Sequence, residues 1–225
     1  MENYSIYLPS YSIGSDVYRK IPEVCRPYGT KIAAIGGHRA IASVKELLLD
    51  AVRDSELQFL EFLWYGGEAT YENVEALQQQ ESVQNADMLF AIGGGKATDT
   101  VKALAEVTHK PVFTVPTIAS NCAACTSVSI MYNPDGSFKN PFFFEKPPVH
   151  AFIQTSVLIH TPTKYMWAGI GDTYAKYFES TISSRGEHPV HYVSLGVGMG
   201  RQCYEPLLLY GKKALEDQKK GELSY

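Results

Sequence analysis

The stretch Met88-Leu-Phe-Ala-Ile-Gly-Gly-Gly-Lys96 decides the fold, because a short apolar run ends there in three glycines and a lysine. A helical pattern follows from Lys96 to Thr108, and Pro111-Val-Phe-Thr-Val115 gives the next apolar run. A strand, a glycine-rich joint, a helix and a second strand form a βαβ unit with parallel strands. The sequence therefore predicts an α/β fold built on a parallel sheet.

The same alternation precedes this stretch. Apolar runs at 31–35 and 58–63 are each followed by a Gly-Gly pair, and helical spacing follows in 41–52 and in 71–83. Parallel strands are covered by helices on both faces, which accounts for runs that are almost continuously apolar. The first 116 residues are thus expected to supply four strands of one sheet.

The pattern changes after residue 116. Strand-like runs at 126–131 and 138–144 flank the turn sequence Asn133-Pro-Asp-Gly136, which predicts an inserted β-hairpin. One more strand is expected at 149–153. Helical spacing begins at Pro162, and a second helix is expected from about Val190 to about Lys219. We place a domain boundary near Thr161–Pro162, which separates an α/β domain (1–161) from a helical segment (162–225).

Composition excludes several classes of protein. The formal charge is −4 and no basic stripe is present, so neither nucleic acid nor an anionic membrane is an expected partner. The N-terminus does not resemble a signal peptide, and no run approaches the roughly 18 apolar residues of a membrane helix. The four cysteines, Cys25, Cys122, Cys125 and Cys203, do not suggest a disulfide framework. A reduced, cytoplasmic setting is expected.

The glycine turn at 93–95 is a candidate phosphate site. Glycines allow close backbone approach, and the N–H groups at the start of the next helix point toward an anion. Lys96 adds a positive charge. The turn is not a Walker A loop, because Phe90 and Ala97 occupy positions that need Gly and Ser or Thr. The alternative is a glycine-rich turn that only closes the strand–helix joint.

Three segments give a specific resemblance. They are Ala91-Ile-Gly-Gly-Gly-Lys-Ala-Thr-Asp-Thr-Val-Lys-Ala103, Val115-Pro-Thr-Ile-Ala-Ser120 and Gly169-Ile-Gly-Asp-Thr-Tyr-Ala-Lys-Tyr-Phe-Glu179. Their sequence and order resemble the signature segments of the glycerol dehydrogenase branch of the iron-containing alcohol dehydrogenase superfamily. The resemblance implies an NAD(P)-dependent, metal-assisted oxidoreductase with an N-terminal dinucleotide-binding domain and a helical C-terminal domain.

The resemblance also implies which residues bind the cofactor. The pyrophosphate is expected at the glycine turn, and further residues are expected beside it or along the cofactor: Gly94, Gly95, Lys96, Asp99, Thr117, Ser120, Thr126, Val128 and Tyr132. The family's ribose-binding acid corresponds to His38, which Arg39 follows. Because arginine suits a 2′-phosphate, we expect NADP(H) to be accepted at least as well as NAD(H).

Asp172 matches the first metal ligand of the family, in which a carboxylate and two histidines hold zinc or iron. The two matching histidines would lie beyond Tyr225, so this chain is expected to be a C-terminally truncated member whose metal site is incomplete. His188 and His191 are interpreted as surface residues, because their spacing does not match the motif.

Cys122 stands where the glycerol-binding members carry an aspartate. The surrounding run resembles the hydroxycarboxylate dehydrogenase branch, so Cys122 is a candidate substrate contact for a small alcohol, a polyol or a 2-hydroxy acid. The alternative is a redox or metal-binding Cys-x-x-Cys pair with Cys125.

Two hypotheses follow from these patterns. The first is an NAD(P)-dependent dehydrogenase that is shortened at its C-terminus. The second is a non-catalytic nucleotide-binding remnant or partner subunit. Because the final helix carries apolar residues around much of its circumference, we expect a homo-oligomer. We also expect weak nucleotide binding, no stoichiometric zinc and no appreciable dehydrogenase activity from the 225-residue product.

Overall fold

The computed structural model describes residues 4–185 and 190–222. The chain divides into two compact units. The first, here called the sheet unit, comprises residues 7–117 and 122–158. The second, here called the helical unit, comprises residues 1–6, 118–121 and 159–225. Within the described ranges, no helix is long and apolar enough to span a membrane.

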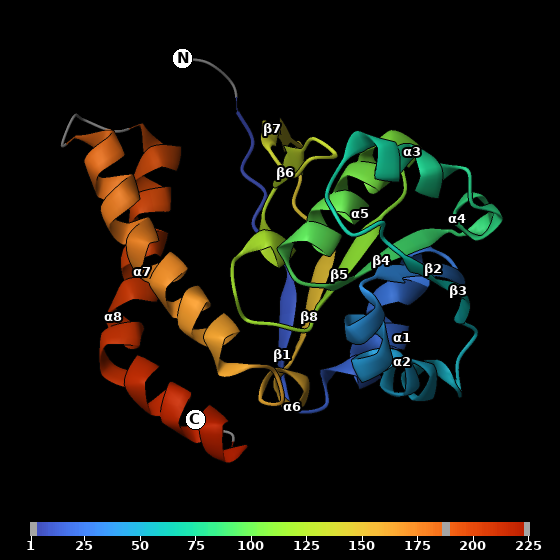
Figure 1. The fold of residues 1–225 in the computed structure, drawn as a ribbon, viewed down its shortest axis with the longest axis horizontal. Coiled ribbons are helices and arrows are strands. Elements are labelled where there is room, and N and C mark those ends of the chain that lie inside the picture. The colour runs from blue at the N-terminus through green and yellow to red at the C-terminus, as the bar shows by residue number, and fades with distance from the viewer. Residues whose placement is uncertain (1–3, 186–189, 223–225) are drawn as a thin grey trace. The chain divides into compact units, whose positions relative to one another are not determined.

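Six parallel strands form the sheet, in the order β1-β8-β5-β4-β2-β3 (Figure 1). Their bounds are β1 Tyr11–Gly14, β2 Lys31–Gly36, β3 Gln58–Trp64, β4 Met88–Gly93, β5 Val112–Pro116 and β8 His150–Gln154. The predicted α/β fold with a parallel sheet is confirmed. The short edge strand β1 has no counterpart in the predicted elements, because its four residues alternate between exposed and half-buried and form no apolar run.

Helices connect the strands and cover both faces of the sheet. Their bounds are α1 Ile21–Cys25, α2 His38–Val52, α3 Tyr71–Gln78, α4 Glu81–Asn85, α5 Gly95–Thr108 and α6 Thr155–Leu158, with 3-10 turns at Val17–Lys20 (η1) and Arg26–Tyr28 (η2). The single helix expected at 71–83 is two helices. The chain is extended at Gln80 (φ −70°, ψ 132°), which ends one helix and provides the N-cap of the next.

Alternate residues of each central strand face opposite layers of the core. In β2, Ile32 and Ala34 pack in one cluster with residues of α1 and α2, whereas Ala33 and Ile35 pack in the other with residues of α3 and α5. Figure 1 shows these helix groups on opposite faces of the sheet. Burial on both faces explains why β2 and β4 are apolar almost throughout, as expected for interior parallel strands.

The predicted hairpin is present after β5. Its strands, β6 Val128–Tyr132 and β7 Phe138–Phe143, pair antiparallel. Gly136 closes the turn with φ +81°, a conformation that favours glycine, and its N–H donates to the carbonyl of Asn133. Met131 of β6 is fully buried in the core cluster that contains α5, so the hairpin is part of the layer over that face.

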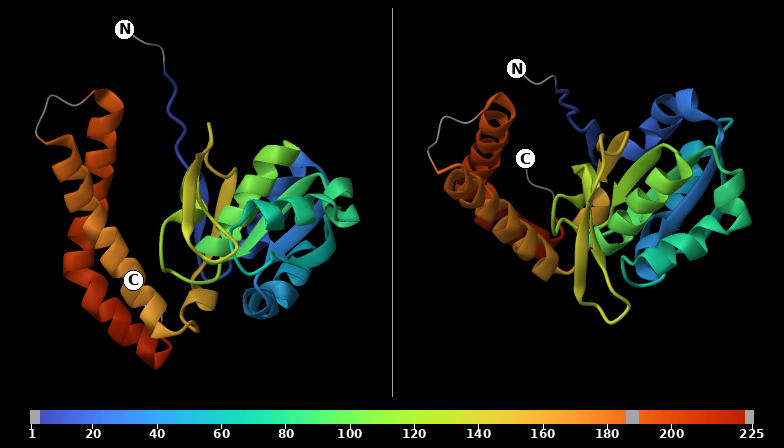
Figure 2. Two further views of the ribbon diagram at one scale, coloured as in Figure 1. Left: turned by 45° about the horizontal axis from the view of Figure 1, so that its top comes forward. Right: turned by 90° about the horizontal axis from the view of Figure 1, so that it is seen from above.

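The helical unit consists mainly of α7 Thr163–Ser184 and α8 His191–Lys220, which run side by side in both views of Figure 2. Gly200 permits close packing, since a Cβ there would lie 3.3 Å from Cα of Tyr177. The ring of Tyr204 stacks on Tyr177 and contacts that of Tyr174 at a tilt of 53°. Much apolar surface of these helices is exposed: Trp167, Phe178, Ile182, Tyr192, Leu195, Met199, Leu208, Leu209 and Tyr210. The expected homo-oligomer stays a prediction.

Candidate functional site

The strand order places a topological switch point between β2 and β4. From β2 the chain crosses through α2 to β3 on one side, and from β4 it crosses through α5 to β5 on the other. The two crossover helices lie on opposite faces of the sheet. In open α/β sheets, ligands bind outside the carboxyl ends of the strands at such a point. The glycine pairs Gly36–Gly37 and Gly93–Gly94 lie at the carboxyl ends of β2 and β4, where a ligand is therefore expected.

Close packing between these two strands requires Gly36. It pairs in register with Ile92, and a Cβ at Gly36 would lie 2.2 Å from the carbonyl oxygen of Ile92. Because that oxygen belongs to the backbone of β4, it cannot move aside easily. Glycine at this position thus allows the carboxyl ends of β2 and β4 to approach each other.

The N-terminus of α5 opens at the carboxyl end of β4. Gly93 has φ +141°, which favours glycine, and Gly94 is the N-cap of the helix. The first helical hydrogen bond runs from Thr98 N–H to the Gly94 carbonyl over 3.1 Å. The N–H groups of Gly95, Lys96 and Ala97 therefore have no acceptor within the helix. Gly94 and Gly95 are half-buried. This arrangement of backbone donors fits a phosphate group.

Lys96, in the first turn of α5, forms an ion pair with Glu68 of the loop that follows β3. The Lys96 side chain is 58% exposed, whereas that of Glu68 is 20% exposed. Glu68 also accepts from the N–H of Ala69, which fixes its carboxylate. The hydrogen bond from Lys96 to Glu68 raises the pKa of Lys96. The lysine is therefore charged and close to the expected phosphate position. Its acidic partner Glu68 was not predicted from sequence patterns, because it lies 28 residues away in the chain.

The start of α2 carries His38 and Arg39, both exposed. The ring of His38 stacks on Trp64 at the end of β3, with ring centroids 5.4 Å apart and an interplanar angle of 11°. These residues thus stand at the carboxyl ends of β2 and β3. Their predicted roles toward a ribose or a 2′-phosphate stay predictions.

A buried ion pair within α5 is hydrogen-bonded to the segment 123–130, which leads into the hairpin. Lys102 lies 3.0 Å from Asp99, and the side chains are 1% and 11% exposed. Lys102 also donates to the carbonyl oxygens of Ala123, Thr126 and Val128. Burial lowers the pKa of Lys102 and raises that of Asp99, and the attraction between the two charges opposes both shifts. Lys102 therefore anchors the segment 123–128 to α5, a role that sequence reasoning missed.

Three predicted cofactor residues take part in this network. The carboxylate of Asp99 accepts from the N–H of Ile130, and the carbonyl oxygens of Thr126 and Val128 accept from Lys102. The polar contacts of Asp99, Thr126 and Val128 are thus with protein groups. Direct cofactor contact by these residues stays a prediction.

Other predicted site residues lie on both units. Thr117 is buried, and its N–H donates to the carbonyl of Gly93 over 3.3 Å, so it adjoins the glycine turn. The N–H of Tyr132 donates to the carbonyl oxygen of Ala69 over 2.8 Å, which places Tyr132 beside the loop that carries Glu68. Cys122 is exposed and belongs to the sheet unit, whereas Ser120 belongs to the helical unit. The predicted roles of Thr117, Tyr132, Ser120 and Cys122 stay predictions.

Asp172 lies on α7 in the helical unit, 3.4 Å from Lys176. His191 is in contact with the Tyr4 hydroxyl over 3.1 Å, and His188 lies outside the described residues. Among the described residues, no three His, Cys, Asp or Glu side chains are grouped to hold a metal ion. The described residues therefore do not fit a catalytic zinc or iron site, for which three protein ligands are usual.

Gly169, three residues before Asp172, is needed for packing inside the helical unit. A Cβ at this position would lie 2.0 Å from the carbonyl oxygen of Ala119. The segment 118–121 therefore packs directly against the backbone of α7. This contact gives a physical reason for the glycine in the Gly-Ile-Gly-Asp segment.

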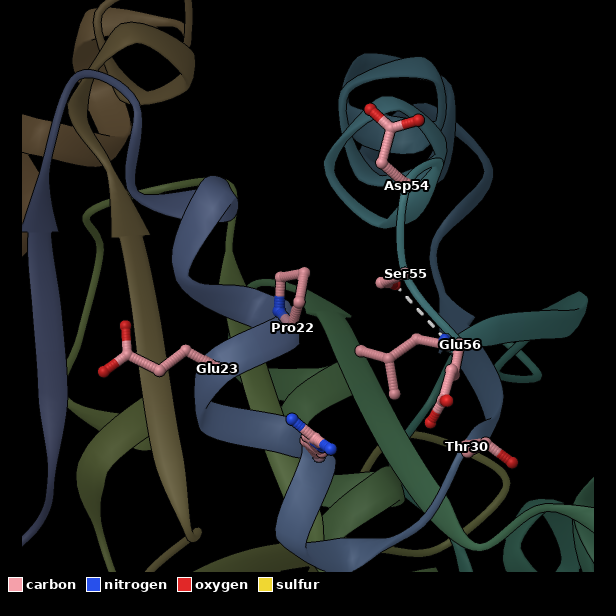
Figure 3. Close-up of a pocket in the computed structure, with 8 residues that line it drawn as sticks. Pro22, Glu23, Thr30, Asp54, Ser55 and Glu56 are labelled. Atoms are coloured by element: carbon pink, nitrogen blue, oxygen red, sulfur yellow. Dashed lines mark hydrogen bonds between the residues drawn. The ribbon is translucent and has the colours of Figure 1, made fainter.

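A cavity of about 480 Å³ lies at the opposite end of the sheet, beside the amino ends of β2 and β3 (Figure 3). Its lining includes Glu23, Thr30 and Asp54. Figure 3 shows the carboxylates of Glu23 and Asp54 pointing in different directions, so they do not converge on one ligand. The cavity therefore adds no candidate site to the one at the switch point.

These features define the class of protein: a doubly wound α/β protein with a glycine turn and a helix N-terminus at its switch point. Residues 9–154 match the model of the family described as iron-containing alcohol dehydrogenase. The chain belongs to the iron-containing alcohol dehydrogenase family.

Known relatives agree with this assignment. The chain is 36% identical over 161 residues to a glycerol dehydrogenase of Thermotoga maritima, a match that covers 68% of this chain and 44% of the relative. It is 31% identical over 191 residues to hydroxycarboxylate dehydrogenase A of Escherichia coli, a match that covers 84% of this chain and 52% of the relative. The crystal structure of glycerol dehydrogenase from Schizosaccharomyces pombe superposes with a TM-score of 0.86 at 25% identity, covering 100% of this chain and 58% of that one. The chain spans about half the length of these relatives.

Proposed function

We propose that the sheet unit binds NAD(P)(H) at the switch point between β2 and β4. The observation that carries this proposal is the glycine turn at 93–95, which directs the N–H groups at the start of α5 outward from the carboxyl end of β4. The pyrophosphate would be held by the N–H groups of Gly95, Lys96 and Ala97 and by the ammonium group of Lys96. The adenosine would extend toward His38 and Arg39 at the carboxyl end of β2.

We further propose that the protein belongs to an NAD(P)-dependent dehydrogenase of small alcohols, polyols or 2-hydroxy acids. Relatives named glycerol dehydrogenase and hydroxycarboxylate dehydrogenase A support this substrate range. The bound nicotinamide would supply the hydride acceptor, while this chain's own groups fix the cofactor and present Cys122 to the substrate. A cysteine at position 122 removes the carboxylate that would repel an acid substrate, which favours the 2-hydroxy acid. No metal-assisted step is assigned to the described residues.

Fluorescence titration with NADH and NADPH tests the cofactor proposal. Lys96→Ala should weaken the affinity about five- to tenfold, since a partly exposed charge-assisted contact contributes on the order of 1 kcal/mol. Lys31→Ala is the matched control, because Lys31 lies at the amino end of β2 and carries the same charge. Equal affinities of the wild type and Lys96→Ala would contradict the assignment.

The same titrations test cofactor choice. The wild type should bind NADPH at least as tightly as NADH, because the guanidinium of Arg39 can pair with a 2′-phosphate. Arg39→Ala should weaken NADPH binding and leave NADH binding nearly unchanged. A strong preference of the wild type for NADH would show that Arg39 does not have this role.

A further inference from the structure

The segment from Cys122 to Cys125 folds into one turn of 3-10 helix, η3 Ala123–Cys125, with Cys122 at its N-cap. The N–H of Cys125 donates to the carbonyl oxygen of Cys122 over 3.0 Å. Such a turn brings the first and fourth Cα atoms within about 7 Å of each other. Disulfides span Cα separations of about 4.4–6.8 Å. The Cα atoms of Cys122 and Cys125 are therefore already about as close as a disulfide requires.

Two buried side chains hold this turn in place. The ammonium group of Lys102 donates to the carbonyl oxygen of Ala123 over 2.9 Å, and the hydroxyl of Thr114 donates to the carbonyl oxygen of Ala124 over 2.9 Å. Both donors are buried, Lys102 on α5 and Thr114 on β5. Because the turn is anchored to two core elements, joining its ends costs little rearrangement, and the second thiol is held close to the first.

The two thiols differ in accessibility. Cys122 is exposed, whereas Cys125 is half-buried. Burial raises the pKa of the Cys125 thiol, proximity to Cys122 adds to this shift, and Lys102 opposes it. Cys122 is thus the thiol that a reagent in solution meets first. Of the other cysteines, Cys25 is buried with its pKa raised to about 12 by burial, and Cys203 is exposed on α8.

We propose that Cys122 and Cys125 are a thiol-modification site, at which a hydroperoxide produces a reversible disulfide. The thiolate sulfur of Cys122 attacks one peroxide oxygen, the O–O bond breaks, and the other oxygen leaves with a proton as an alcohol or water. The sulfur of Cys125 then attacks the sulfenic acid of Cys122. The S–S bond forms as the S–O bond breaks, and the hydroxide leaves as water with the proton of Cys125. The two thiols lose two electrons and the peroxide gains them.

This site goes beyond the proposed dehydrogenase function, because it depends only on the turn and its two anchors. Nucleotide binding is not required for the thiol chemistry. A failed nucleotide titration would therefore leave this proposal standing, and a failed thiol experiment would leave the cofactor proposal standing.

The experiment treats the reduced full chain with hydrogen peroxide, alkylates the remaining thiols and maps the tryptic peptides by mass spectrometry. Cys122 and Cys125 share the peptide 103–139, so their disulfide appears there as a loss of two hydrogens. We expect two of the four thiols to disappear, both from this peptide, and to return on reduction with dithiothreitol. Cys203→Ser should behave as the wild type. In Cys125→Ser, dimedone should trap a sulfenic acid on Cys122.

Several results would overturn the proposal. One is a dimedone adduct on Cys122 that accumulates in the wild type without the internal disulfide. Another is a disulfide between Cys122 and Cys203, or oxidation of Cys122 no faster than that of Cys203. Thr114→Val tests the anchoring separately, since it should slow disulfide closure and leave the first oxidation of Cys122 unchanged. Closure at the wild-type rate in Thr114→Val would contradict a preorganised turn.

Discussion

Lys102→Met should destabilise the sheet unit strongly. The ammonium group of Lys102 is the counter-charge of buried Asp99 and the donor to three backbone carbonyl oxygens in 123–128. Methionine fills a similar volume and provides neither a charge nor a donor. Removing one partner of a buried ion pair costs about 3–5 kcal/mol, because the remaining charge stays buried without compensation. We expect the free energy of unfolding to fall by that amount.

The double variant Asp99→Asn/Lys102→Met separates charge from hydrogen bonding. Neither replaced side chain is charged in this variant. The remaining loss in the free energy of unfolding comes from the missing donors to the carbonyl oxygens and is about 1–3 kcal/mol. The double variant should therefore be more stable than the single variant Lys102→Met. The difference between the two should shrink at low pH, because burial already raises the pKa of Asp99 and loss of Lys102 raises it further.

Urea denaturation followed by tryptophan fluorescence measures these differences. The two tryptophans lie on different units, Trp64 on the sheet unit and Trp167 on the helical unit. A Trp167→Phe background leaves Trp64 as the reporter, and its stacking on His38 is lost when the sheet unit unfolds. A loss below about 1 kcal/mol for Lys102→Met would refute the assigned role, given the cost of breaking a buried pair. So would a double variant as unstable as the single one.

Two further predictions concern the sheet. Burial, together with nearby Lys20, lowers the pKa of His150, whose ring nitrogens contact Ser10 and Ser12 over 2.8 and 3.0 Å. The unfolded chain then binds more protons, so the stability contributed by His150 is present above about pH 6.5 and is lost as the pH falls toward the lower folded pKa. His150→Gln should flatten this loss in urea titrations, and equal slopes in both proteins would rule it out. Gly36→Ala should lower the free energy of unfolding by about 1–3 kcal/mol, because its Cβ would clash with Ile92. The adjacent control Gly37→Ala should have little effect, because its Cβ would lie 3.7 Å from Tyr65. Similar stabilities of the two variants would show that close packing of β2 and β4 does not require Gly36.

Local patterns predicted most elements of the fold. Apolar runs identified β2, β4 and β5, because interior parallel strands need apolar side chains on both faces. The turn residues around Gly136 identified the hairpin, because glycine tolerates the positive φ of that position. Short or interrupted elements were missed or merged: β1 forms no apolar run, and the extended Gln80 divides a segment whose helical spacing is nearly continuous.

The sequence by itself determined the class of fold and the glycine turn at 93–95, since both depend on residues that are neighbours along the chain. Only the tertiary structure decided that β4 pairs with β2 on the side away from β3, which creates the switch point. It alone also paired Lys96 with Glu68 and Lys102 with the carbonyl oxygens of 123–128. The physical reason is that ion pairs and hydrogen bonds act over a few ångströms in space, and their partners here lie more than twenty residues apart in sequence.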